Sequence, residues 1–305
     1  MTDTANVAAP RAARGPTCST RAREAGESLA ATASFGRRWL LLEVAGAWGP
    51  SAFRDSPLLD PALGARIERR AGAAGFRLVA IRRPGRGRHA DGTRWRWARV
   101  DSAPGVEGIV WGEVAGPADY LSVPFDQPGT RSDDMIVAVC AHGRHDQCCA
   151  TRGRSVAALL REDDPEAVWE CSHIGGDRFA ATMLLLPHGI NYGWADTVGA
   201  RQMVREYRAG RVVLAGLRGR SAFGFLEQAA QDAARRTFGD LRVDAYRPVR
   251  SVELTQQSWE VFLADPAGEI RVELAQTFSE PLYSNCAATV ALPRPMFAVR
   301  SVSRP

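Results

Sequence analysis

Two short segments of the chain concentrate residues that bind metals. Cys140 and Cys149 form a Cys-x8-Cys pattern, and Cys171, His173 and Asp177 follow in one further segment. Thiolates and imidazoles are soft or borderline ligands that suit zinc and iron–sulfur centres. Because these residues gather at the expected ends of secondary-structure elements, the pattern indicates a metal or an iron–sulfur centre rather than a disulfide.

Two strands and a helix are expected to position these ligands. The β-branched run at 135–140 predicts a strand that ends on Cys140, and a helix predicted at 150–161 begins just after Cys149. Near a helix N-terminus the dipole favours the thiolate form of cysteine. A further strand is predicted at 167–171, so the second segment also lies at a strand end.

The composition is that of an ordinary globular protein. Its 305 residues are 45% hydrophobic and 24% charged, which allows one large domain or two. No apolar run approaches the roughly 18 residues of a membrane span, and the first 17 residues lack the apolar core of a secretory signal. Six cysteines are too few for a disulfide scaffold. We therefore expect a cytoplasmic protein that does not bind membranes.

The charge excludes little by itself. The net charge is +5, and all 39 basic residues are arginine, which indicates the GC-rich coding bias of a bacterial genome. A cluster of arginines at 82–99 surrounds Trp95 and Trp97, but the alternation of a strand explains it without nucleic acid. The modest positive electrostatic field of this net charge suits an acidic redox partner protein. The sequence does not determine the oligomeric state.

The apolar pattern predicts an α/β fold. The expected elements are strands at 38–45, 76–81, 94–100, 135–140, 167–171, 258–263 and 269–274, a hairpin at 183–194, and helices at 62–74, 150–161, 197–208 and 223–238.

These elements also suggest a division of the chain. We expect a disordered tail over 1–20, an N-terminal α/β domain over 21–130, a cluster domain over 131–212, and a C-terminal helix with strands over 213–305 that complete the fold. The Pro/Gly/Asp-rich segment 124–134 would be the linker.

The sequence resembles the sucrase/ferredoxin-like family. The matching segments are Val-Cys-Ala-His-Gly-Arg-His-Asp-Gln-Cys-Cys at 139–149, Trp-Glu-Cys-Ser-His-Ile-Gly-Gly-Asp-Arg-Phe-Ala at 169–180 and Leu-Pro-His-Gly-Ile-Asn-Tyr-Gly at 186–193. This resemblance implies a thioredoxin-like ferredoxin domain, a central mixed sheet flanked by helices, that carries a [2Fe–2S] cluster.

The resemblance also implies a set of ligands. The family pattern has two cysteines separated by eight residues, and then two histidines as His-x3-His. Cys140, Cys149 and His173 match it position by position, whereas Asp177 stands where the second histidine is expected. A carboxylate is a harder ligand and rarer on such clusters. Asp177 and Cys171 therefore compete for the fourth position.

Three functions follow from these residues. The leading one is a soluble electron carrier with a [2Fe–2S] cluster. The alternative is a redox-silent, tetrahedral structural zinc site that uses Cys140, Cys149, Cys171 and His173. A thiol–disulfide enzyme is disfavoured because there is no Cys-x-x-Cys motif. Despite the family name, the sequence offers no paired carboxylates for sugar hydrolysis, so it favours a redox carrier over a hydrolase.

The remaining cysteines and loop histidines are expected to have structural roles. Cys148 is interpreted as a buried neighbour of Cys149, and Cys18 and Cys286 as small apolar residues of the core. His142 and His145 are expected to be solvated residues of the loop, in the range 141–148, between the ligand cysteines.

Overall fold

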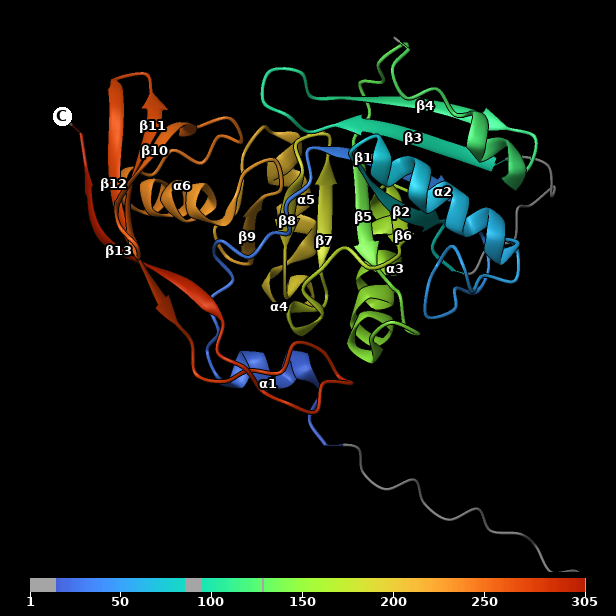
Figure 1. Ribbon diagram of the computed structural model, residues 1–305, viewed down its shortest axis with the longest axis horizontal. Helices are drawn as coiled ribbons and strands as arrows, with labels where there is room; N and C mark the ends of the chain where they lie inside the picture. The colour runs from blue at the N-terminus through green and yellow to red at the C-terminus, as the bar shows by residue number, and fades with distance from the viewer. Residues whose placement is uncertain (1–14, 86–94, 128, 305) are drawn as a thin grey trace, which may run out of the picture.

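A nine-stranded mixed sheet forms the centre of the protein, and a four-stranded antiparallel sheet stands at its side (Figure 1). The structure is a computed structural model that describes residues 15–85, 95–127 and 129–304. In the large sheet the order is β4-β3-β1-β2-β6-β5-β7-β8-β9. Its strands are β1 (Arg38–Glu43), β2 (Phe76–Arg82), β3 (Trp95–Asp101), β4 (Gly108–Val114), β5 (Ile136–Cys140), β6 (Val168–Cys171), β7 (Met183–Leu186), β8 (Ile190–Tyr192) and β9 (Leu217–Arg220).

Only two neighbouring pairs in this sheet are parallel, β1 with β2 and β5 with β6. Each parallel pair is joined by a helical crossover, as parallel strands require. The helices are α1 (Cys18–Glu24), α2 (Pro61–Ala73), α3 (Arg154–Asp163), α4 (Ala195–Val198), α5 (Ala200–Arg208) and α6 (Phe225–Phe238), with short helical turns η1 (Pro117–Ser122), η2 (Cys149–Gly153) and η3 (Asp177–Phe179).

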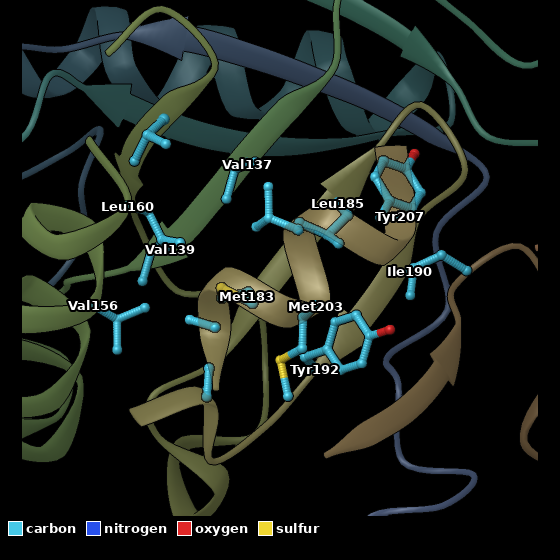
Figure 2. Close-up of a cluster of buried hydrophobic side chains, with 14 of the residues drawn as sticks. Val137, Val139, Val156, Leu160, Met183, Leu185, Ile190, Tyr192, Met203 and Tyr207 are labelled. Carbon is cyan, nitrogen blue, oxygen red and sulfur yellow. The ribbon is translucent and has the colours of Figure 1, made fainter. Parts of the chain in front are cut away.

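Helices cover one face of the large sheet. Ile67 and Ala71 of α2 pack on Leu40 and Leu42 of β1. The apolar sides of α3 and α5 cover the β5–β8 half, where the cluster in Figure 2 is assembled, among others, from Val137, Val139, Val156, Leu160, Met183, Leu185 and Met203. Since alternate residues of a strand point to opposite faces, the other residues of these strands form a second core.

The second core fills the opposite, inward-curving face. It draws on both halves of the sheet, with Trp39 of β1 as well as Ala138 of β5 and Trp169 of β6. The sheet bends back on itself, because Trp111 of β4 stacks near Trp169 with ring centroids 5.7 Å apart, although three strands separate β4 from β6 in the sheet. The ligand cysteines predicted from sequence belong to this core.

The four-stranded sheet is formed by the C-terminal part of the chain. Its strands are β10 (Arg247–Thr255), β11 (Ser258–Asp265), β12 (Gly268–Phe278) and β13 (Pro295–Ser303). An alanine-rich side of α6 packs against Val261, Leu263 and Val272 of this sheet. Between β12 and β13 the residues 279–294 leave the sheet and run alongside α1 (Figure 1).

The predicted mixed α/β class, with a large central mixed sheet and flanking helices, is confirmed. The thioredoxin-like assignment stays a prediction, as do the domain boundaries. No break in the sheet marks residue 130, because strands from both sides of it pair in one sheet. Strands β4, β9, β10 and β13 were not expected from the sequence.

The predicted tail over 1–20 is wrong at its end. Helix α1 begins at Cys18, since the side chain of Thr17 accepts a hydrogen bond from the Thr20 amide and Cys18 and Ala22 are buried. Residues 1–14 lie outside the described residues, as does the middle of the arginine cluster at 82–99. In the part of the chain that the structure describes, every helix is too short or too polar to span a lipid bilayer.

The joint between β2 and β6 is short but carries a buried ion pair. Only Ile81 with Cys171 and Arg82 with Glu170 are paired there. The Arg82 guanidinium lies 2.7 Å from the Glu170 carboxylate, and both side chains are less than 5% exposed. Trp48 covers the guanidinium, 4.0 Å from its ring centroid.

Replacing Glu170 by alanine is expected to lower the free energy of unfolding by about 3–5 kcal/mol, because it leaves a buried arginine without its counter-charge. Urea unfolding followed by circular dichroism measures this loss. Glu166→Ala is the matched control, since Glu166 pairs with Arg83 at 2.8 Å but is 81% exposed. That control should cost about 0–1 kcal/mol. Equal losses of unfolding free energy in the two variants would contradict a stabilising role of the buried Arg82–Glu170 ion pair.

Candidate metal centre

The parallel pair β5–β6 brings the two predicted ligand segments to one edge of the sheet. Cys140, the last residue of β5, lies opposite Cys171, the last residue of β6. The Ala141 amide donates to the Cys171 carbonyl at 3.0 Å, which extends the pairing beyond the strands. His173 follows two residues later, so both segments turn away from the sheet at the same place.

A close contact between Gly153 and the backbone of Cys140 brings Cys149 next to Cys140. After the loop 141–148 the chain forms the turn η2, and Gly153 at its end packs on the carbonyl of Cys140. A Cβ atom at position 153 would lie 1.9 Å from that carbonyl oxygen, so only glycine fits there. The Cys149 thiol then contacts the Cys140 thiol, which lowers the pKa of Cys140 and, together with burial, raises the pKa of Cys149.

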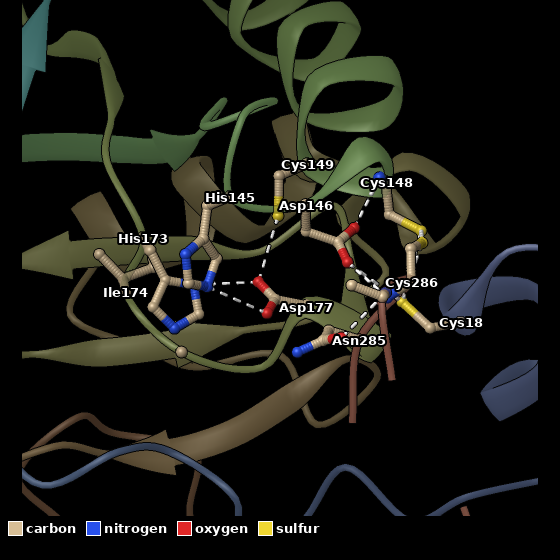
Figure 3. Close-up of polar contacts among 12 residues, drawn as sticks. Cys18, His145, Asp146, Cys148, Cys149, His173, Ile174, Asp177, Asn285 and Cys286 are labelled. Carbon is tan, nitrogen blue, oxygen red and sulfur yellow. Dashed lines mark hydrogen bonds and ion pairs between the residues drawn. The ribbon is translucent and has the colours of Figure 1, made fainter. Parts of the chain in front are cut away.

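Asp177, the last residue of the second predicted ligand segment, contacts residues of both segments (Figure 3). Its Oδ1 lies 2.9 Å from Nδ1 of His173 and 3.6 Å from Sγ of Cys149, and its Oδ2 lies 3.4 Å from Nε2 of His145. The His145 and His173 rings lie against each other with centroids 3.8 Å apart. One carboxylate therefore contacts two imidazoles and one thiol.

The charges of this group depend on one another. Burial raises the pKa of Asp177, but its contacts with His145 and His173 outweigh burial and hold the pKa well below its usual range. The contact with Asp177 in turn raises the pKa of His145. Nδ1 of His173 is buried and lacks the alignment of a hydrogen bond to any partner in the described residues, in spite of its closeness to Asp177.

A double-glycine turn holds His173 and Asp177 in place. Gly175 and Gly176 have φ of 93° and 86°, a conformation that other residues rarely adopt. The fully buried Arg218 donates to the Gly175 carbonyl at 2.8 Å and to the Thr32 carbonyl at 2.5 Å. Burial lowers the pKa of Arg218 to about 9, so this residue places a positive charge beneath the turn near neutral pH.

A second group of residues that could bind a metal ion lies beside the first one (Figure 3). Cys148 Sγ is 3.5 Å from Cys18 Sγ and 3.2 Å from Cys286 Sγ, and Cys286 Sγ is 3.5 Å from Cys18 Sγ. Asp146 completes the group, and its Oδ2 lies 3.8 Å from Cys18 Sγ. Three distant parts of the chain thus contribute one thiol each.

The structure brings most of the predicted site residues together. Cys140 contacts Cys149, Cys149 contacts Asp177, and Asp177 contacts His173. Cys171 is fully buried beside Cys140, and burial raises its pKa well above the usual value. Among the described residues, Cys171, Cys140 and Cys149 all lie outside the groups of three or more possible ligands whose donor atoms are within 4.8 Å of one another, whereas His173 and Asp177 form such a group with His145.

The interpretation of the other cysteines and histidines holds in part. Cys148 is a buried neighbour of Cys149, Cys18 belongs to the core and His145 is exposed. Cys286 is exposed rather than a core residue, and the thiols of Cys18, Cys148 and Cys286 meet. His145 contacts Asp177, and His142 is buried with Nε2 2.7 Å from the Gly49 carbonyl. The only signal in the sequence was the density of ligand types in the loop between the expected strand and helix.

Comparison with known proteins identifies one family. Residues 74–219 match the family model described as sucrase/ferredoxin-like, which confirms over this segment the family predicted from the motifs. No curated protein and no solved structure matches the chain. The matched segment contains both predicted ligand segments but neither Cys18 nor Cys286.

Replacing Asp177 by asparagine is expected to lower the pKa of His145 in the metal-free protein, because contact with Asp177 is the largest influence that raises it. NMR titration of the histidine ring protons measures this pKa. His188, whose pKa is lowered by burial beside Tyr207, is the internal control and should titrate as in the wild-type protein. An unchanged pKa of His145 in the Asp177→Asn variant would contradict the contact between His145 and Asp177.

The same substitution should have a pH-dependent effect on stability. The raised pKa of His145 stabilises the fold below the unfolded value of about 6.5, and this contribution is lost as pH rises through the folded value. The lowered pKa of Asp177 stabilises the fold above about 3.9, and this contribution is lost on acidification. The loss in Asp177→Asn should therefore be greatest between about pH 4 and 6.5.

Proposed function

We propose, from the sucrase/ferredoxin-like match of residues 74–219 and the geometry around Asp177, that the protein is an electron carrier with a [2Fe–2S] cluster. Cys140, Cys149, His173 and Asp177 would hold the cluster. The observation that carries the proposal is that these four residues form two adjacent pairs.

The pairing matches the needs of a two-iron cluster. Each iron of a [2Fe–2S] cluster takes two protein ligands, so the ligands must come as two pairs at the two ends of the cluster. Cys140 and Cys149 are in contact through their thiols, and His173 and Asp177 approach each other to 2.9 Å. The contact between Cys149 and Asp177 joins the pairs.

The protonation states of Cys140 and Asp177 support the same assignment. Metal ligands must be deprotonated, and the pKa of Cys140 is lowered while Asp177 is ionised at neutral pH. Cys149, whose pKa is raised by its contact with Cys140 and by burial, would lose its proton when the metal binds. Nδ1 of His173 is a buried nitrogen without an aligned hydrogen-bond partner among the described residues, as expected of a ligand nitrogen that lacks its metal. The residues therefore fit the group that the family implies.

The protein residues would tune and protect the centre. A bound [2Fe–2S] cluster would supply one-electron redox chemistry. His145 would hold the Asp177 carboxylate in place, and Arg218 would offset the negative charge of the ligands from below the double-glycine turn. The proposed ligand set has two thiolates, one histidine and one carboxylate that makes hydrogen bonds of its own. It differs from a four-cysteine site, in which all ligands are thiolates.

Electrons would enter where the site approaches the surface. His145 and His173 are about one-third exposed, at 35% and 33% of their side chains, whereas the cysteines are buried. Beside them Arg144, Arg154 and His142 line a hollow of about 480 Å³. This arginine-lined edge suits an acidic redox partner protein, and no nucleic acid is needed to explain it.

A mononuclear zinc site is the second candidate. His145, His173 and Asp177 place one ligand atom each within 4.8 Å of one another, which is a donor set that zinc accepts. Such a site would be colourless and redox-silent. A thiol-redox function on a thioredoxin-like scaffold has less support, because Cys140 and Cys149 are both buried.

Cys140→Ser and Cys149→Ser are each expected to abolish the visible absorption and the iron content of anaerobically purified protein, since each removes a thiolate ligand. Absorption and EPR spectra, with iron and zinc counted in the same sample, measure this. Cys18→Ser is the control and should keep its iron. Full iron retention in both ligand variants, or a colourless wild-type protein with one zinc, would refute the proposal.

The identity of the fourth cluster ligand can be tested separately, because Asp177, Cys171 and His145 all lie near the other three proposed ligands. Asp177→Ala is expected to shift the EPR g-values and shorten the lifetime of the cluster. Cys171→Ala and His145→Ala should leave the g-values close to those of the wild-type protein. A shift in one of these two variants and none in Asp177→Ala would assign the fourth position to that residue instead.

A further inference from the structure

The thiols of Cys18, Cys148 and Cys286 form a compact triangle that the proposed cluster does not use. The three sulfur–sulfur distances are 3.5, 3.2 and 3.5 Å. In the sequence these residues lie 130 and 138 positions apart, so tertiary structure alone brings them together. A gathering of three thiols around one carboxylate calls for a chemical explanation, because a free cysteine usually behaves as a small apolar residue.

We propose that Cys18, Cys148, Cys286 and Asp146 bind one divalent cation of the zinc type. Three thiolates and one carboxylate are a donor set that zinc takes in tetrahedral coordination. At a zinc–sulfur distance of about 2.3 Å, the sulfurs of a tetrahedral site lie about 3.8 Å apart, slightly wider than the triangle of thiols. A small outward shift of the side chains therefore admits the ion.

The shape of the triangle distinguishes this site from the first one. In a two-iron cluster the ligands lie at opposite ends of the cluster as two pairs. Here the three thiols lie at similar distances from one another, between 3.2 and 3.5 Å, so they surround a single point. A single ion fits this arrangement, whereas a cluster does not.

Asp146 is held in place before any ion arrives. Its Oδ1 accepts the Cys148 amide and its Oδ2 accepts the Cys286 amide, both at 2.7 Å. These bonds fix the backbones that carry two of the three thiols. Because each carboxylate oxygen has two lone pairs, Oδ2 can still face the third thiol, that of Cys18, and bind a cation.

The position of the site suggests a clamp between the two ends of the chain. Cys18 begins α1, a helix of seven residues that is too short to be stable alone. Cys286 lies in the segment 279–294, which leaves the four-stranded sheet and has no regular structure beyond an isolated bridge. Arg21 of α1 stacks on Tyr283 of that segment at 4.6 Å. A bound ion would fix both to the loop that carries Cys148.

The experiment uses the full chain, purified without chelators, with zinc and iron counted by mass spectrometry. Cys286→Ser is expected to lose one zinc per chain while keeping the iron and the visible spectrum of the wild-type protein. Cys140→Ser should lose the iron while keeping one zinc per chain. The experiment therefore distinguishes failure of the proposed iron–sulfur cluster from failure of the proposed zinc site. Cys171→Ser, which removes a buried thiol outside the triangle, is the matched control and should keep its zinc.

A second measurement does not depend on a variant. Zinc-edge X-ray absorption of the wild-type protein should give three sulfur neighbours at about 2.3 Å and one oxygen at about 2.0–2.2 Å. Wild-type protein that takes up no more zinc than Cys286→Ser from excess zinc ions would overturn the proposal. So would a disulfide between Cys148 and Cys286 in protein alkylated at lysis, because an oxidised pair cannot bind the ion.

Discussion

The segment 141–149, which comprises the loop 141–148 and Cys149, is the constraint on which the two proposed sites depend. Neighbouring residues in it serve different groups, since His145 contacts Asp177 while Asp146 contacts the amide of Cys286. Further along, Cys148 meets Cys18 and Cys149 meets Asp177. The loop can serve both groups only if its backbone is fixed at each end, by β5 and by the close contact of Gly153 with the Cys140 carbonyl.

The surroundings of the loop provide this rigidity and offset the charge. The site lies on the inward-curving face of the sheet, where the strand ends are buried in one apolar core. Carboxylates and thiolates would be costly to bury without compensating charge or hydrogen bonds. Histidines beside Asp177 and the buried Arg218 beneath the double-glycine turn supply positive charge, and backbone amides stabilise Asp146.

Local patterns predicted much of the fold and the position of four of the eight residues that make up the two proposed sites. The apolar runs at β5 and β6 placed Cys140 and His173 at strand ends, because strand period and burial are local properties of the sequence. The partners of Cys148 could not be predicted, since Cys18 and Cys286 approach it only through the path of the whole chain. The edge strands were also not predicted. An exposed edge strand such as β10 lacks the regular alternation of buried and polar residues.

The continuous sheet has a consequence for how the protein unfolds. One core takes side chains from β1 and β2 as well as from β5, β6 and β7, so neither half retains its buried surface when the other is lost. Local openings can then be confined to the margins of the chain, whereas loss of the core must involve residues on both sides of position 130 at once. Cleavage of the chain between the halves would leave two fragments that remain associated or unfold together.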